Sequence, residues 1–224
     1  MTILSAILYC LAQHPLLSWP VLVLVGALLG WGMARWRGHP GWALLMAPFF
    51  FFGIANIFTG HIFNALFLNA FGETGTAVVT HAEETNSTLN DQPIWAYDAV
   101  LKTADGRDVV TGFNTMSASI YPIRNEILIP PEGEAFVAKY VPGFPRNMAI
   151  MSDLSPYGKV YRIGQDRRPV DKAANQWEVS PGNAAFIAEY RKALTVFLAK
   201  HRHDADPALV QRYQAELDAL PRSD

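Results

Sequence analysis

Apolar and polar positions are distributed very unevenly along the chain. The first 70 of the 224 residues contain no Asp or Glu, and their only basic residues are Arg35 and Arg37. A bilayer core about 30 Å thick is crossed by roughly 20 apolar residues in a helix. Two uncharged stretches reach about this length, residues 16–34 and 41–70, with the short segment RWRGHPG between them. The pattern predicts a transmembrane helical hairpin over residues 16–70.

The second stretch is longer than a bilayer requires, because thirty helical residues extend about 45 Å. We expect it to tilt, to kink near Pro48, or to project beyond the membrane at its C-terminal end. Residues 1–15 form an apolar tail that lacks the basic residues with which a cleaved signal peptide begins. The tail therefore predicts a short helix that either lies at the outer surface of the membrane or extends the first span.

The two arginines between the spans predict the orientation of the hairpin. Lys and Arg close to membrane spans favour the cytoplasmic side. Arg35 and Arg37 lie in the hinge, whereas the outer ends of both spans carry no basic residue nearby. We therefore expect two spans in a bacterial inner membrane, with the hinge in the cytoplasm and the C-terminal part in the periplasm.

Residues 71–152 show the alternation that is typical of short β-strands. In IWAYDAVLKT, apolar residues from Trp95 to Leu101 recur at every second position. Similar strands are predicted in GTAVVTHAEE, DVVTGFNT, EAFVAKYV and NMAIM, and NSTLNDQP is typical of a loop. The Asp105-Gly106 pair predicts a hairpin turn, because glycine tolerates a positive φ. The segment predicts a small antiparallel β domain, either a sandwich or a half-barrel.

The last third of the chain changes character. Residues 153–180 are polar and interrupted by prolines, which predicts an irregular connector. Residues 181–224 predict a helical hairpin, with Asn183 and Asp206 as N-caps and Pro207 at the first position of the second helix. Both helices carry an apolar stripe that needs a partner surface. We expect them to pack on the β domain; the alternative is that one face contacts another protein. The fold class is thus α+β.

The segments GTAVVT, IWAYDAVLKTADGR and EAFVAKYVPGFPRNMAI together resemble the bacterial domain-of-unknown-function 3592 family. In that family the last strand ends in Tyr-x-Pro followed by a second Pro, and Tyr140, Pro142 and Pro145 match these positions. The chain departs from the pattern at Phe144, where the family usually has Asn. The resemblance covers residues 75–151. It implies a compact β domain beside membrane spans in the bacterial envelope, and it implies no activity.

Small residues in the first predicted span form a motif for helix packing. Gly26, Gly30 and Ala34 recur every four residues, which permits close approach between membrane helices. The simplest partner is the second span of the same chain. A homodimer through this face is the alternative.

Polar residues in the second predicted span also share one face. Asn56, Gly60 and Asn64 recur every four residues. Polar groups in a bilayer are costly unless they contact protein or water. We expect this face to contact the first span or a partner embedded in the membrane.

The remaining candidate chemistry is sparse. His201, His203, Asp204 and Asp206 are the densest set of metal-ligand types, but they lie in an apparent linker and are expected to be solvated. The sequence contains no Gly-x-Ser-x-Gly nucleophile motif and no phosphate-binding glycine loop. We therefore expect no cofactor, no bound metal and no catalytic residue.

Charge excludes one class of partner. Beyond Ala70 the chain has sixteen basic and twenty acidic residues, interspersed and with a net charge of −4. No basic run is dense enough to indicate nucleic-acid binding. The sequence thus predicts a non-enzymatic membrane protein that contacts the lipid bilayer and presents a periplasmic domain to a protein partner. It would serve as an immunity protein against a toxin or as an accessory subunit of an envelope complex. The alternatives are a metal-dependent enzyme using His201 and His203, and an oligomeric channel or transport component.

Overall fold

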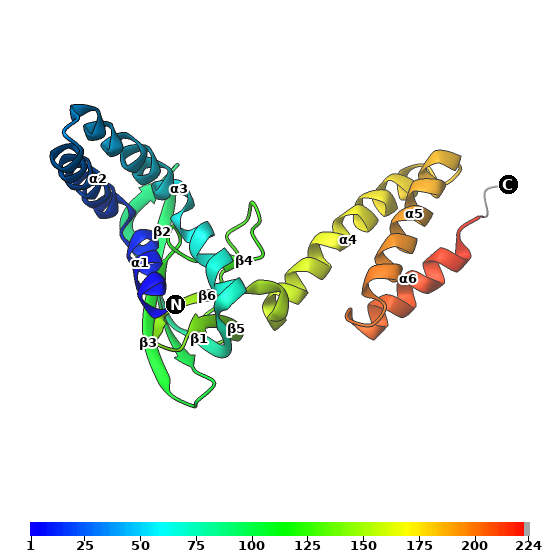
Figure 1. The fold of residues 1–224 in the computed structure, drawn as a ribbon. Helices are drawn as coiled ribbons and strands as arrows, with labels where there is room; N and C mark the ends of the chain where they lie inside the picture. Colours follow the sequence, from blue (N-terminus) through cyan, green and yellow to red (C-terminus); the bar gives the residue numbers. More distant parts are fainter. Residues whose placement is uncertain (222–224) are drawn as a thin grey trace. The chain divides into compact units, whose positions relative to one another are not determined.

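The computed structural model describes residues 1–221 and confirms an α+β chain with two long apolar helices near its N-terminus (Figure 1). It divides into two compact units, Met1–Tyr157 and a helical unit that begins at Gly158. The predicted C-terminal segment of residues 181–224 ends in three residues that lie outside the described part. Each unit is described by itself.

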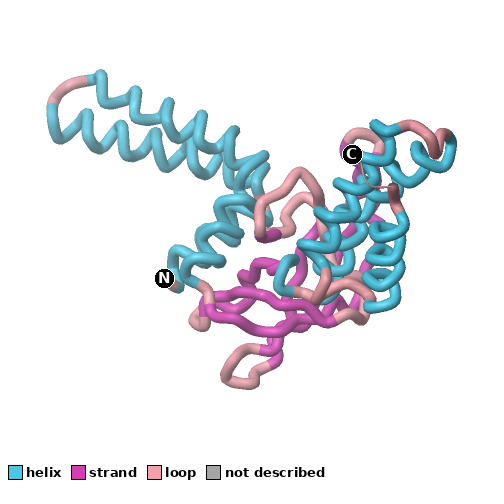
Figure 2. Tube along the Cα trace, turned by 90° about the vertical axis from the view of Figure 1, so that its right-hand side faces the viewer, coloured by secondary structure: helices cyan, strands magenta, loops and turns pink. Residues whose placement is uncertain are grey.

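The first unit begins with helices that precede the sheet. They are α1 (Thr2–Gln13), α2 (Pro15–Arg37), the short 3-10 helix η1 (Pro40–Leu45) and α3 (Met46–Phe71). Helices α2 and α3 project from the sheet as an antiparallel pair in both views (Figures 1 and 2). Gly38, with φ of 68°, ends α2 in the left-handed conformation that glycine adopts without strain. The chain therefore turns back within a few residues, as the hinge segment predicts.

The second apolar stretch begins with a short 3-10 helix and ends in a helix that packs on the sheet. Pro48 lies in the first turn of α3, where its missing N–H disrupts no helical hydrogen bond, and the irregular segment is η1 just before it. At the other end, Ala65 and Leu68 are fully buried against Val141 and Ala149 of the sheet. The C-terminal end of this long helix thus packs on the β domain, and its tilt and projection relative to a membrane stay predictions.

Within residues 1–221, the sheet has six strands in the order β3-β2-β1-β5-β6-β4. The strands are β1 (Glu73–Leu89), β2 (Gln92–Lys102), β3 (Asp108–Asn114), β4 (Ile120–Tyr121), β5 (Ala135–Val141) and β6 (Phe144–Met151). Five form antiparallel pairs, but β4 runs parallel to β6. The prediction of a wholly antiparallel sheet is therefore wrong at this edge, because β4 reaches β6 by a crossover rather than by a hairpin.

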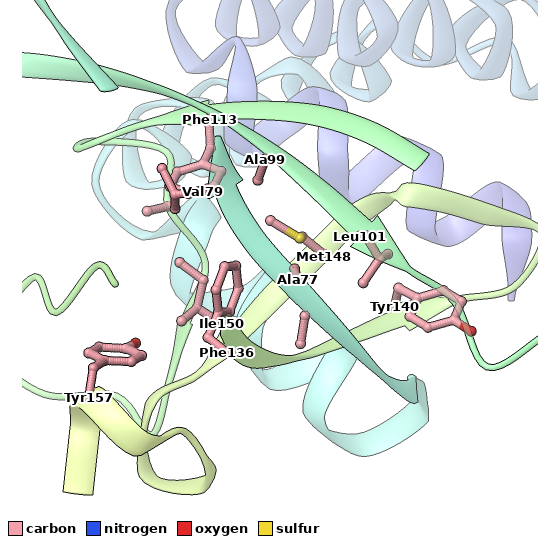
Figure 3. Packing of buried hydrophobic residues seen from close by; sticks show 12 residues of the cluster. Ala77, Val79, Ala99, Leu101, Phe113, Phe136, Tyr140, Met148, Ile150 and Tyr157 are labelled. Atoms are coloured by element: carbon pink, nitrogen blue, oxygen red, sulfur yellow. The ribbon is translucent and has the colours of Figure 1, made fainter. Parts of the chain in front are cut away.

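The sheet curls so that its edge strand β3 returns to β6. The hydroxyl of Thr111 on β3 donates a 2.7 Å hydrogen bond to the carbonyl of Arg146 on β6, although the two strands are not neighbours in the sheet. Every second residue of a strand faces the same side, and the residues inside the curl form one core (Figure 3). They are Ala77, Val79, Ala99, Leu101, Phe113, Ala118, Phe136, Ala138, Tyr140, Met148, Ile150 and Tyr157. The curled sheet corresponds to the half-barrel, not the sandwich.

Two tight turns show what local sequence predicts and what it leaves out. Gly106 has φ of 84° in the turn between β2 and β3, which confirms the predicted hairpin. Asn90 and Asp91, with φ of 50° and 60°, form the turn between β1 and β2. The expected loop NSTLNDQP is therefore mostly strand. Asn and Asp tolerate positive φ, and this was the signal for a two-residue turn.

In its described residues, the helical unit contains three helices where two were expected. They are α4 (Pro156–Val179, which starts just inside the first unit), α5 (Ala184–His201) and α6 (Pro207–Ala219). The prediction of an irregular connector over residues 153–180 is wrong, because α4 covers nearly all of it despite Pro169. Asn183 and Asp206 accept hydrogen bonds from the N–H groups of Ala185 and Ala208, so both predicted caps are confirmed.

Helix α4 supplies the partner surface that α5 and α6 need. Val170 and Ala173 of α4 are buried in one core with Leu194 and Phe197 of α5 and Tyr213 of α6. Within the helical unit, α5 and α6 thus share a core with α4, and the expectation that they pack on the β domain stays a prediction. The apolar positions of α4 are few, so only the packed structure distinguishes this helix from a polar connector.

Candidate functional site

A buried polar network joins α1, α3 and the β domain. Asn147 of β6 donates from its side-chain nitrogen to Asn64 Oδ1 at 2.8 Å, and Asn64 donates back to Asn147 Oδ1 at 2.7 Å. The Asn147 nitrogen also lies 3.0 Å from both the carbonyl and the hydroxyl oxygen of Ser5. Asn64 donates in addition to the hydroxyl of Ser119 at 2.8 Å. All four side chains are almost fully buried.

The position of Asn147 follows from strand alternation. Met148 and Ile150 of β6 face the core inside the curled sheet, so Asn147 and Ala149 face outward, where α1 and α3 pack. A buried amide without partners is costly, whereas a satisfied network fixes one arrangement of the elements that contribute to it. The reciprocal pair of amides therefore sets how α3 sits on the sheet.

The rest of the polar face of α3 lies against α1. Asn56 donates from its side chain to the carbonyl of Leu11 at 2.9 Å. A Cβ added to Gly60 would lie 3.2 Å from the same carbonyl, so α1 approaches closely there. The expectation that Asn56, Gly60 and Asn64 contact the first span or an embedded partner is wrong. These residues lie where α3 leaves the hairpin, and their partners are α1 and the β domain.

The small residues of α2 lie where the two long helices approach each other. A Cβ added to Gly26 would lie 2.8 Å from the Cβ of Phe49, and one added to Gly30 would lie 2.7 Å from the carbonyl oxygen of Trp42. Ala34 follows one turn later and is half-buried. This face is filled by the same chain, and the homodimer stays a prediction.

Two clefts flank His61 of α3 in the first unit. The larger, of about 420 Å³, lies between the junction of α1 with α2 and the β domain, where His14, Pro15 and Asn114 line it. The smaller, of about 240 Å³, lies between α3 and loops of the β domain, and Ile127 lines its far side. Both are lined mainly by apolar side chains and hold no convergent set of acid, base and nucleophile.

His201 is buried in the helical unit rather than solvated. Its Nε2 lies 2.8 Å from Asp166 Oδ2 and its Nδ1 lies 3.1 Å from Asp204 Oδ1. Only 4% of its side chain is exposed. The expectation of a solvated linker is therefore wrong for this residue. His203 is exposed and Asp206 caps α6, so the four residues do not converge on one point.

Electrostatics at this site centre on Asp166. Lys200 Nζ lies 2.6 Å from the same carboxylate oxygen that contacts His201. Burial by itself raises the pKa of Asp166, but the hydrogen bonds from Lys200 and His201 outweigh burial and lower the pKa below its usual value. The carboxylate is thus held in its charged form and stabilises the contact between α4 and α5.

A groove lies between α4 and α5 of the helical unit. It has a volume of about 660 Å³, and its apolar lining includes Pro169 and Val196. Arg168, Lys172 and Lys192 line it together with Lys200, whereas its acidic residues are Asp166 and Glu189. Because Lys200 and His201 already pair with Asp166, the remaining charge of the groove is positive.

The other predicted residues have structural positions. The hydroxyl of Tyr140 accepts a 2.7 Å hydrogen bond from the N–H of Ala104, next to the turn that contains Asp105. Pro142 lies in the turn between β5 and β6, and Pro145 lies in β6. These residues belong to the β domain and line none of the clefts described above.

Arg35 and Arg37 lie at the end of α2 nearest the hinge, as the sequence places them. The guanidinium of Arg37 lies 4.7 Å from the ring centre of Trp36. Within the described residues, no group of three or more His, Cys, Asp and Glu side chains is arranged to hold a metal ion.

Comparisons with known proteins identify no relative of this chain. No family model matches the chain, and searches of curated proteins and of solved structures find no match. The resemblance to the domain-of-unknown-function 3592 family therefore stays a prediction.

Sequence reasoning missed the residues that complete both polar sites. Ser5, Ser119 and Asn147 bind Asn64 directly or through one another, and Asp166 binds His201. Asn147 directly precedes the apolar residues Met148 to Met151 of the same strand, and this was the one local sign of a buried polar partner. The pairing itself joins residues 83 positions apart.

Replacing Asn147 with Ala should loosen the attachment of α1 and α3 to the sheet. It removes both hydrogen bonds to the Asn64 side chain and those to Ser5, and an unsatisfied buried polar group costs about 1–3 kcal/mol. We expect denaturant unfolding in detergent to show this loss and hydrogen exchange to show reduced protection in α1. The exposed Asn86→Ala change in β1 is the control and should alter stability by less than about 0.5 kcal/mol. Unchanged protection in α1 would contradict the proposed role.

Replacing Asp166 with Asn should remove an acid-sensitive part of the stability of the helical unit. The pKa of Asp166 is lower in the folded chain than the unfolded value of 3.8. The charged carboxylate therefore stabilises the fold at pH values above 3.8, and this stabilisation is lost as the pH falls through the lower pKa of the folded chain. The variant should therefore be less stable than the original chain at neutral pH, and the difference should shrink below about pH 4. Urea unfolding at a series of pH values, with hydrogen exchange in α5 as the readout, measures this difference in stability. The exposed Glu178→Gln change is the control; a difference independent of pH would refute the assignment.

Proposed function

We propose that the chain is a two-span membrane protein that holds a folded β domain at the surface of the bilayer. The observation that carries this proposal is the exposure of apolar side chains along α2 and α3. The candidate spans are Pro15–Arg37 and Pro40–Phe71, and in the most apolar 18-residue segment of each only 17% is buried. A core helix of a soluble protein buries its apolar face against other elements. An apolar surface of this length matches the hydrocarbon interior of a bilayer.

The packing of α1 argues against a removable signal sequence. Ser5 of α1 is fully buried and contacts Asn147, and Ala12 is buried as well. Cleavage after α2 would remove α1 and leave the Asn147 amide with fewer partners. We therefore infer that α1 and α2 are retained.

Charge and the position of α1 support one orientation of the hairpin. The hinge carries Arg35 and Arg37, and Trp31 and Trp36 are exposed near it, as in the aromatic belt of a membrane surface. Because α1 packs on β6, the N-terminus and the β domain lie at the same end of the hairpin. A hairpin of two membrane spans brings both of its chain ends to the same side of the bilayer. We propose that the hinge is cytoplasmic and that the β domain and helical unit are periplasmic.

Within this arrangement, the helical unit is the candidate for contact with another protein. Its groove between α4 and α5 combines apolar lining residues with the basic residues Arg168, Lys172 and Lys192, which favours an acidic partner surface. An immunity protein and an accessory subunit of an envelope complex both use such a displayed surface.

The enzyme and channel alternatives gain no support from the described residues. Both ring nitrogens of His201 are already occupied by carboxylates, which leaves none for a metal ion. The polar face of α3 is filled by α1 and the sheet, which leaves it unable to line a pore. We therefore propose a non-enzymatic role.

Labelling of single cysteines in cells tests the orientation. In a Cys10→Ser background, His39→Cys reports on the hinge and Lys102→Cys on the β domain; both residues are exposed. A membrane-impermeant maleimide should label position 102 in spheroplasts and position 39 only after lysis. Labelling of position 39 but not 102 in spheroplasts would reverse the orientation. Labelling of both would exclude a two-span insertion.

Charge reversal in the groove tests the contact surface. Lys172→Glu combined with Lys192→Glu should abolish co-purification of an envelope partner with the detergent-solubilised full chain, because two attractive charges become repulsive. Lys159→Glu lies on α4 outside the groove and should leave co-purification unchanged. Equal effects of the two changes would exclude the groove as the contact surface.

A further inference from the structure

Four apolar side chains are exposed together at one end of the β domain. Leu89 lies at the end of β1, Met116 follows β3, and Ile123 and Ile127 lie in the loop between β4 and β5. Ile127 is 58% exposed and the others at least a third. Isolated apolar residues on a surface need no explanation, but a contiguous group indicates an interaction site. We call these four residues the apolar rim.

The rim lies beside α3. Its four residues, together with His61 and Ile62 of α3, line the cleft of about 240 Å³. Figure 1 shows the loop between β4 and β5 next to α3. The turn between β2 and β3 is at the other end of these strands, because β2 runs from Gln92 near the rim to Lys102. The rim therefore lies at the end of the β domain that is next to the helical hairpin.

The rim lies beside the part of α3 at which the hairpin meets the β domain. His61 also lines the second cleft, together with His14 and Pro15 at the junction of α1 and α2. Pro15 is the first residue of α2, so the outer end of one proposed span lies beside His61. On the proposed insertion, the rim thus lies at the outer surface of the bilayer.

Apolar side chains of α3 are exposed near the level of the rim. Phe58 and Phe63, which precede and follow His61 in the sequence, are both exposed. The charged residues at the cleft are Arg124 and Glu126, and Arg124 is paired with Asp153 through two hydrogen bonds of 2.6 and 2.8 Å. Apolar side chains with charges at their edge are typical of elements that lie at the boundary of headgroups and acyl chains. This chemistry fits lipid better than a charged protein surface.

We propose that the apolar rim is a second membrane contact, in which Leu89, Met116, Ile123 and Ile127 enter the outer leaflet and a lipid acyl chain occupies the cleft beside α3. This inference rests on the proposed membrane insertion of α2 and α3. It adds that the β domain is held against the bilayer rather than standing clear of it. The domain would then have one fixed face toward lipid and the opposite end toward water.

Spin labelling of the full chain in vesicles of phosphatidylethanolamine and phosphatidylglycerol tests the proposal. In a Cys10→Ser background, labels are placed by Ile127→Cys in the rim, by Leu24→Cys on α2 and by Val110→Cys on β3. Val110 is the matched control, because it is an exposed β-branched residue of the β domain that does not line the cleft. Accessibility to oxygen and to a water-soluble nickel chelate is measured for each label.

We expect the label at position 127 to resemble the one at position 24, with high oxygen and low nickel accessibility, and the label at position 110 to show the reverse. A label at position 127 that resembles position 110, while position 24 is in lipid, would overturn the rim and leave the membrane anchor intact. A label at position 24 in water would overturn the anchor and the rim together. The two failures are therefore distinguishable.

A second variant separates insertion of the rim from insertion of the label alone. With the label at Leu89→Cys, the added change Ile127→Glu should raise nickel accessibility at position 89 several-fold, because a carboxylate is expelled from the acyl region. Val110→Glu should leave it unchanged. Equal nickel accessibility in the two variants would show that position 127 does not hold the domain against lipid.

Discussion

The reciprocal hydrogen bonds between Asn64 and Asn147 are the constraint on which the first unit depends. Both amides are almost fully buried between α3 and the outer face of β6, with Ser5 and Ser119 as their further partners. Each amide is costly to bury alone, so the two elements gain stability only when they dock in one arrangement. Helix α1 is included through Ser5. The network therefore makes one folded body of the helical hairpin, the N-terminal helix and the sheet.

This attachment gives the long apolar helix two different environments. Its first half exposes apolar side chains, whereas its last turns bury Ala65 and Leu68 against the sheet. A helix that is continuous through such a boundary transmits its tilt directly to the domain, with no linker in between. On the proposed insertion, the β domain has a fixed height and a fixed face at the membrane.

The helical unit is organised by a different interaction. Its core is closed by α4, and the contact between α4 and α5 is reinforced by the carboxylate of Asp166, which pairs with both Lys200 and His201. Those pairs neutralise one acidic side chain of the neighbouring groove and leave its basic residues without that counter-charge. The structural ion pairs thus also shape the charge of the surface that we assign to protein contact.

The sequence by itself determined the features that depend on neighbouring residues. These are the apolar hairpin, the caps Asn183 and Asp206, the alternating strands and the Asp105-Gly106 turn, because each follows from local conformation or periodicity. Tertiary structure alone decided which groups meet across the chain. Asn64 pairs with a residue 83 positions away, β3 curls back to β6, and His201 is buried against Asp166, 35 positions away. Helix α4 forms in a polar, proline-containing segment because its few apolar residues are buried by α5 and α6. Burial between distant segments leaves no periodic trace in the sequence, so only the folded chain shows it.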